Sequence, residues 1–325
     1  MAKTANNTDE LSQKAAGLMD EAFVLDAASV FRVGGPGRPR LPMGNFNLDT
    51  SLIDDWEALG LNAISHPSGV TDADVYVGHI KMLAMWNSFI ADNHNRLIRL
   101  DKPESFDEVK KSGKIGVSIG PHHADIFRTP DDIDYFYSLG LRSCILVLFG
   151  QNRLGTAVDE PSGGGLTSYG KRVIARMNQV GMAVDVSHCN NETRLGAVEA
   201  SEKPVFFSHA NPLATCKNTR NVSDDVIKAM AGRGGVLGVM PLRMMVSDNE
   251  PTSLENYIDQ IEYICDLVGP EYVGIGTEAP IEGFDTLAPE HQIPLPAYMR
   301  NEGVQRKLDL PELYGTGRLY VIVEA

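Results

Sequence analysis

Short apolar stretches alternate with longer segments of helical periodicity along most of the chain. Eight of these stretches are rich in β-branched or other apolar residues, and several are apolar at almost every position, as expected of strands buried on both faces. They comprise residues 23–31, 61–64, 114–119, 141–149, 182–186, 204–207, 235–240 and 272–275. The pattern therefore predicts eight strands of a largely buried sheet.

Helices are predicted between these strands. Residues 166–179 place apolar side chains at spacings of three and four, and Gly181 is well suited to end the helix. Similar periodicity or helix-start signals occupy residues 131–138, 191–200, 222–231 and 253–267. Strands that alternate with helices at this rhythm predict βαβ units and a parallel sheet.

Eight such units favour an α/β fold closed into a single (β/α)8 barrel that covers residues 1–325. A doubly wound open sheet is the alternative, but no G-x-G-x-x-G sequence follows the first predicted strand to support it. Residues 1–20 are expected to form a helical extension. Residues 280–325 are expected to form a short, irregular closure.

The composition argues against several classes of protein. A formal net charge of −14 opposes binding to nucleic acid, because the phosphates would be repelled. The four cysteines are scattered, which favours reduced thiols, and Cys189 is expected to be a small buried one. No apolar stretch of about 20 residues predicts a membrane span, and residues 1–20 lack the apolar centre of a signal peptide. We therefore expect a cytoplasmic protein, and a homodimer is compatible with the sequence.

Polar residues at the predicted strand ends are the candidates for chemistry, because active sites of barrels form on that face. They comprise His66, His122, His123, Gln151, Asn152, His188, His209 and Glu278. His188 and His209 end consecutive strands, whose tips lie within reach of one ion. Since imidazole suits Zn²⁺, a metal or substrate role is predicted for this pair. A hydrogen-bonded structural role is the alternative for any single strand-end histidine.

Six motifs, taken in order along the chain, resemble those of the renal (membrane) dipeptidase family, peptidase family M19. They are GLTSYG at 165–170, MN at 177–178, GMAVDVSH at 181–188, PVFFSH at 204–209, TRN at 219–221 and VGIG at 273–276. The resemblance covers roughly residues 105 to 280. It implies a (β/α)8 barrel of the amidohydrolase-like type that cleaves dipeptides at a binuclear zinc site.

The resemblance also implies roles for individual residues. His188 and His209 match the zinc-binding histidines after strands five and six, and Arg220 matches the arginine that holds the substrate carboxylate. Strand one departs from the family, because Asp26-Ala-Ala-Ser-Val30 replaces Asp-Gly-His-x-Asp and removes two ligands.

Other family positions differ as well. The bridging glutamate of the family falls at about His122, and the catalytic aspartate is replaced by Glu278. A histidine that touches substrate in the family falls near Leu148 or Phe149, neither of which can coordinate a metal.

These observations predict a hydrolase of a small amide or dipeptide with one Zn²⁺ at most. His188 and His209 would bind the ion, with His122 or His123 completing the ligand set. Glu278 would act as the general base. Arg220 and Asn152 would bind the substrate.

Two other readings stay open at this point. One is a metal-free homologue that serves as a ligand-binding protein or a non-catalytic subunit. The other is a lyase or isomerase on the same scaffold.

Overall fold

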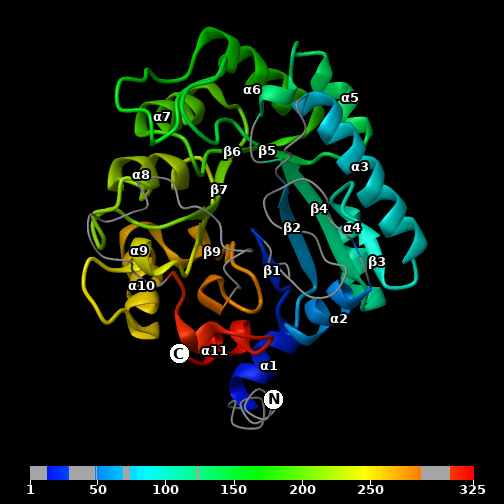
Figure 1. Cartoon of the computed structure of the whole chain (residues 1–325), viewed down its shortest axis with the longest axis vertical. Coiled ribbons are helices and arrows are strands. Elements are labelled where there is room, and N and C mark those ends of the chain that lie inside the picture. The colour runs from blue at the N-terminus through cyan, green and yellow to red at the C-terminus, as the bar shows by residue number, and fades with distance from the viewer. Residues whose placement is uncertain (1–12, 29–47, 49, 69–73, 122–123, 287–307) are drawn as a thin grey trace.

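Eight parallel strands form a closed (β/α)8 barrel in the computed structural model, which describes residues 13–28, 48, 50–68, 74–121, 124–286 and 308–325. The barrel strands are β1 (Leu25–Asp26), β2 (Ala63–Ser68), β4 (Ile115–Pro121), β5 (Ser143–Ile145), β6 (Ala183–Asp185), β7 (Val205–Ala210), β8 (Leu237–Val239) and β9 (Val273–Ile275). Figure 1 shows them around a common centre with helices outside. Each of the eight predicted strands overlaps one of them, so the predicted fold is confirmed.

Two sheets are joined into one barrel at two places. The first sheet contains β1, β2 and β4, and the second runs from β5 to β9. Ile119 of β4 forms a parallel bridge with Leu141, just before β5. On the other side, the Ala27 amide donates to the carbonyl of Ile275 in β9 at 3.0 Å. These contacts close the ring.

A ninth strand among the described residues was not predicted. β3 (Leu97–Arg99) pairs in parallel with the first half of β4, where Leu97 lies opposite Ile115. Its two apolar residues, Leu97 and Ile98, lie between Arg96 and Arg99, so no apolar run marks the strand in the sequence. Its position at the edge of β4 explains why it does not enter the count of barrel strands.

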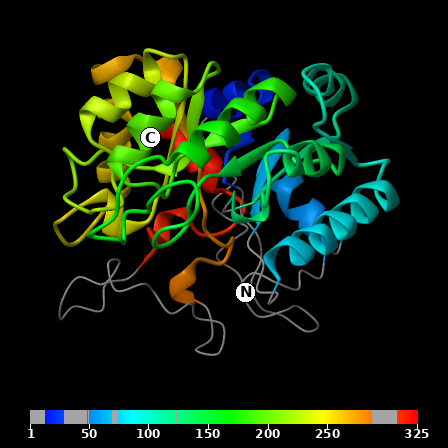
Figure 2. The same cartoon turned by 90° about the horizontal axis from the view of Figure 1, so that it is seen from above.

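Helices cover the outside of the barrel on all sides. They are α1 (Gln13–Glu21), α2 (Ser51–Ala58), α3 (Val75–Asp92), α4 (Glu104–Ser112), α5 (Asp132–Ser138), α6 (Ser168–Val180), α7 (Asn191–Ala200), α8 (Asp224–Ala231), α9 (Arg243–Val246), α10 (Leu254–Val268) and α11 (Arg318–Glu324). In Figure 2, α3 lies on one side of the strands, and the yellow and orange helices lie on the opposite side. No helix in the described part of the chain is long and apolar enough to span a membrane.

Local sequence signals explain where α6 and α7 begin and end. Thr167 accepts a hydrogen bond from the Gly170 amide at 2.9 Å, and Asn190 accepts one from Thr193 at 2.9 Å. Gly181 ends α6 in the left-handed conformation, with φ of 85°. Val173, Ile174 and Met177 of α6 are fully buried, as the periodicity predicts, and Tyr169 is partly buried.

The closure between β1 and β9 depends on a buried carboxylate. Asp26 accepts hydrogen bonds from the Thr277 hydroxyl at 2.6 Å, the Thr277 amide at 3.0 Å and the Ala28 amide at 3.1 Å. Burial raises the pKa of the Asp26 carboxyl to about 6, although the hydrogen bonds from Thr277 oppose the shift. Asp26 therefore links the first strand to the loop that follows the last one.

The raised pKa of Asp26 should make the stability of the protein depend on pH. Because the ordinary pKa is 3.8, the folded protein binds more protons than the unfolded chain between about pH 4 and pH 6. The free energy of unfolding should fall as the pH rises through that window. Asp26→Asn does not titrate and keeps a group that can bond Thr277. The free energy of unfolding of Asp26→Asn minus that of wild type should be larger at about pH 7.5 than at about pH 4, by about 2–3 kcal/mol.

Urea unfolding at both pH values measures this difference. Asp92→Asn, at an exposed position of α3, is the matched control for the loss of one carboxylate. A difference between Asp26→Asn and wild type that is the same at both pH values would contradict a titrating, buried Asp26.

Candidate metal centre

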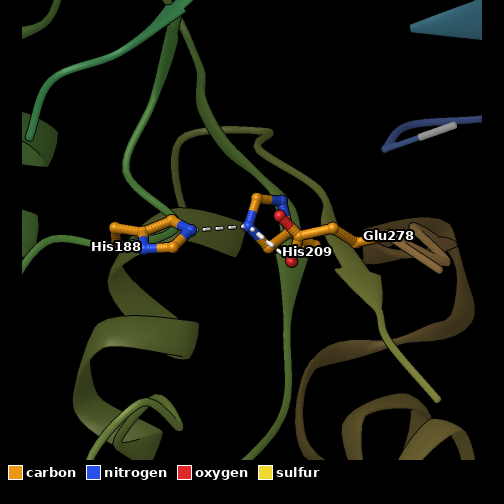
Figure 3. A group of neighbouring side chains, drawn as sticks. All are labelled: His188, His209 and Glu278. Carbon is orange, nitrogen blue, oxygen red and sulfur yellow. Dashed lines mark hydrogen bonds and ion pairs between the residues drawn. The ribbon is translucent and has the colours of Figure 1, made fainter. Parts of the chain in front are cut away.

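Three side chains with metal-ligating atoms converge beyond the carboxyl ends of three strands. His188 follows β6, His209 lies near the end of β7, and Glu278 follows β9. Nε2 of His188 is 2.9 Å from Nε2 of His209, which is 3.2 Å from Oε2 of Glu278. Figure 3 shows the His209 ring between the other two side chains. The structure therefore brings the two predicted histidines together with the predicted base.

The centre is buried on the histidine side and open on the glutamate side. His209 is fully buried and His188 is 4% exposed, whereas the Glu278 side chain is 22% exposed. The two imidazole rings meet edge to face, with centroids 5.0 Å apart. Phe149 packs edge-on against His188 with centroids 6.1 Å apart, and it is 46% exposed. Glu278 and Phe149 are thus the side chains of this group that solvent reaches.

The donor atoms fit a divalent cation. Metal–ligand bonds of about 2.0–2.1 Å at angles of about 90–110° place neighbouring donors ~2.9–3.4 Å apart. The distances of 2.9 Å and 3.2 Å at His209 fall in that range. All three ligand atoms lie within 4.8 Å of one another. Two imidazoles and one carboxylate form a donor set that suits zinc and several other transition metals.

Glu278 is held in an uncommon backbone conformation. Its φ is 42°, and among the described residues no other non-glycine residue has a positive φ. Its amide donates to the carbonyl of Ala28 at 2.8 Å. Arg318 of α11 donates to the next two carbonyls, those of Ala279 at 3.1 Å and Pro280 at 2.7 Å. A conformation of this kind persists only where the surroundings enforce it, and it occurs often at functional sites.

Two fully buried arginines form hydrogen bonds with backbone carbonyls at or next to the two histidines. Arg220 donates to the carbonyls of Ser187 and His209, the latter at 3.4 Å. Arg194 donates to the carbonyls of Ser187 and Arg220, both at 3.1 Å. Burial, and then the charge of Arg220, lowers the pKa of Arg194 to about 9. The contact of Arg220 with a substrate carboxylate, which the family resemblance implies, stays a prediction.

The side chain of Asn152 organises its own loop after β5. Its Nδ2 donates to the carbonyl of Leu146 at 2.9 Å, and its Oδ1 accepts from the amides of Leu154 at 2.8 Å and Gly155 at 3.1 Å. These bonds explain why an asparagine is suited to this position. Its predicted contact with substrate stays a prediction.

The other predicted metal ligands are His122 and His123, and Cys189 is the thiol next to His188. His122 and His123 lie outside the described residues, so their role as metal ligands stays a prediction. Cys189 is fully buried, and burial raises the pKa of its thiol to about 12. It therefore stays protonated at neutral pH, in agreement with the expected small buried thiol.

Sequence reasoning did not single out Arg318 or Asp185 as part of the site. Arg318 lies far from Glu278 in the chain and reaches its loop only through the fold. Asp185 lies inside an apolar strand, where a fully buried carboxylate is itself an unusual feature that could have marked it.

Comparison with known proteins identifies the class. The chain belongs to the membrane dipeptidase family, peptidase family M19, whose model matches residues 57–289. Dipeptidase verJ of Clonostachys rogersoniana is 32% identical over 174 residues, which is 53% of this chain and 45% of that protein. Dipeptidase aclJ of Aspergillus oryzae is 31% identical over 147 residues, or 44% of this chain and 35% of that protein. The matches thus span less than half the length of these relatives.

Solved structures show the same fold. An amidohydrolase from Pseudomonas aeruginosa superimposes with a TM-score of 0.79 at 24% identity, over 95% of this chain and 90% of that one. A metallo peptidase from Rhodobacter sphaeroides, liganded with a phosphinate mimic of the dipeptide L-Ala-D-Ala, superimposes with a TM-score of 0.68 at 16% identity. This second match covers 92% of this chain and 90% of that one. At these identities the likeness concerns the fold.

The backbone at Glu278 predicts a stability difference between two variants. Glu278→Ala and Glu278→Gly both lose the carboxylate, but only alanine keeps a Cβ in the left-handed region. We expect the free energy of unfolding of Glu278→Gly to exceed that of Glu278→Ala by about 1 kcal/mol. Denaturant unfolding of the two metal-free variants measures the difference. Equal stabilities would show that position 278 is not strained.

Proposed function

We propose that this protein is a mononuclear metal-dependent hydrolase of a small amide or dipeptide. The observation that carries the proposal is the convergence of His188, His209 and Glu278 at the carboxyl ends of barrel strands. Membership of the membrane dipeptidase family supports amide hydrolysis as the reaction. Zinc is the ion we propose, because two imidazoles and a carboxylate are a common zinc-binding set.

The residues around the centre would have different roles. His188 and His209 would hold the ion from the buried side, and Oε2 of Glu278 would complete the protein ligands among the described residues. A divalent ion held there supplies Lewis-acid chemistry, which lowers the pKa of water and polarises a carbonyl. The other oxygen of Glu278 would accept a proton from the attacking water and pass it to the leaving amine. Glu278 suits this role because it is a carboxylate 3.2 Å from Nε2 of His209 whose side chain is partly exposed to water.

The end of β1 offers few ligands for a second ion. Ala28 occupies the position where the family carries a histidine ligand, and its carbonyl accepts the Glu278 amide. The Asp26 carboxylate is engaged with Thr277 and Ala28. Within the described residues, one group of three His, Cys, Asp or Glu side chains has metal-binding spacing. We therefore propose one ion for each chain.

Metal binding tests this proposal directly. Protein purified without a histidine tag should bind about one Zn²⁺ per chain, as measured by equilibrium dialysis and elemental analysis. His188→Ala should weaken binding by more than the ~10–100-fold that follows loss of a group that merely orients a ligand. His94→Ala, at an exposed position after α3, is the matched control and should bind as wild type does. Equal zinc binding by His188→Ala and wild type would refute the site.

The reaction should be restricted to a narrow set of substrates. Loss of one of two ions removes several kcal/mol of transition-state stabilisation, which corresponds to orders of magnitude in rate. We expect negligible hydrolysis of a simple dipeptide such as Gly-Leu, even with added Zn²⁺, as measured by release of free leucine. Turnover of a preferred substrate should vanish in His188→Ala. Robust cleavage of Gly-Leu by the pure protein would contradict the expected loss of ordinary dipeptidase activity.

A further inference from the structure

A chain of buried hydrogen bonds runs from Asp185 to the far side of the His209 ring. The Ser187 hydroxyl lies 2.5 Å from Oδ1 of Asp185 and 3.1 Å from the hydroxyl of Ser208. The Ser208 hydroxyl lies 2.8 Å from Nδ1 of His209. All four residues are at most 4% exposed. The chain therefore connects a buried carboxylate to the ring nitrogen that faces away from the metal centre.

The surrounding donors fix the direction of these hydrogen bonds. Oδ1 of Asp185 accepts from the amides of Ser187 at 2.9 Å and Ser208 at 3.3 Å, so it acts as an acceptor. The Ser187 hydroxyl must then donate to it. The Ser187 oxygen also accepts the amide of His209 at 3.2 Å. The Ser208 hydroxyl therefore donates its hydrogen bond to the Ser187 oxygen.

The Ser208 oxygen is then left to accept a hydrogen bond from Nδ1 of His209. A neutral imidazole with its proton on Nδ1 has a lone pair on Nε2. This lone pair points towards Nε2 of His188 and the carboxylate of Glu278, at 2.9 Å and 3.2 Å. In the metal-free protein this lone pair can accept a hydrogen bond from Nε2–H of His188, and it can bind a cation once that proton leaves. The opposite tautomer would place a proton where the cation binds.

We propose that Ser208, anchored through Ser187 and Asp185, is a positioning residue that fixes His209 in the Nδ1–H tautomer and so sets the affinity of the centre for a divalent cation. The cation rests on the proposed function, whereas the tautomer of His209 does not. A group that orients a metal-ligating histidine typically changes metal affinity by ~10–100-fold when it is removed. The two consequences can therefore be measured separately.

The tautomer is tested in the metal-free protein by nuclear magnetic resonance. Protein labelled with ¹⁵N-histidine shows in a two-bond proton–nitrogen correlation which ring nitrogen carries the proton, at about pH 8, where imidazoles are neutral. His209→Asn assigns the signal. Wild type should show His209 with its proton on Nδ1. Ser208→Ala, which deletes one oxygen atom, should lose this preference, and Ser208→Thr, which keeps the hydroxyl, should retain it.

A matched control separates this effect from the general loss of a buried serine. Ser201 is 3% exposed, and its hydroxyl donates to the carbonyl of Lys203 at 2.7 Å, in the segment that follows α7. Ser201→Ala should leave the tautomer of His209 as in wild type. If Ser208→Ala also left it unchanged, or if wild type carried the proton on Nε2, the proposal would be overturned.

Zinc titration by calorimetry supplies the second measurement. Ser208→Ala should bind Zn²⁺ ~10–100-fold more weakly than wild type, and Ser201→Ala should bind equally well. Equal affinity in Ser208→Ala and wild type would refute the role of the hydroxyl in metal binding. Failure of wild type itself to bind zinc would refute the proposed function instead, while the tautomer measurement would still decide the hydrogen-bond direction.

Discussion

The parallel register of β6 and β7 is the constraint on which the centre depends. Asp185 lies opposite Phe206 in this pairing, and His188 and His209 each follow three residues further along. The two imidazoles therefore leave the barrel at the same height, with Nε2 atoms 2.9 Å apart. A shift of the pairing by one residue would move the end of one strand relative to the other by about 3.3 Å and so separate the two imidazoles.

Close approach of the next strands supports this geometry. A Cβ added to Gly238 of β8, or to Gly276 after β9, would overlap the carbonyl oxygen of Ser208. Glycine at both positions lets the backbone of β7 pack tightly against its neighbours just before His209. The same packing holds the backbone of Ser208, whose hydroxyl lies next to Nδ1 of His209. The fold therefore also orients the metal ligand.

The charges around the centre support the proposal of one ion. The guanidinium groups of Arg194 and Arg220 are buried directly behind the histidines and bind backbone carbonyls. These positive charges disfavour a cation at the centre. Among the described residues, Glu278 is the carboxylate that belongs to the metal-binding group and offsets that charge. A second dication would add repulsion at short range, and it needs further carboxylates to offset that charge. The alanines that follow Asp26 offer none.

The sequence predicts the barrel well because its strands are continuous apolar runs and its helices have clear start and stop signals. It also predicts the pairing of His188 with His209, since both end consecutive strands. It does not predict that Glu278 lies in hydrogen-bonding range of His209, because that distance depends on how β9 closes against β1 and on Arg318 of α11. β3 is missed because its two apolar residues are flanked by Arg96 and Arg99 and form no apolar run.

X-ray absorption spectroscopy of the zinc-loaded protein would show how many ions the centre holds and which atoms bind them. We expect a single ion with two imidazole nitrogens and a carboxylate oxygen at about 2.0–2.1 Å, and no neighbouring metal. A second metal at ~3.5–4 Å, or a set of ligands without imidazole, would contradict this expectation.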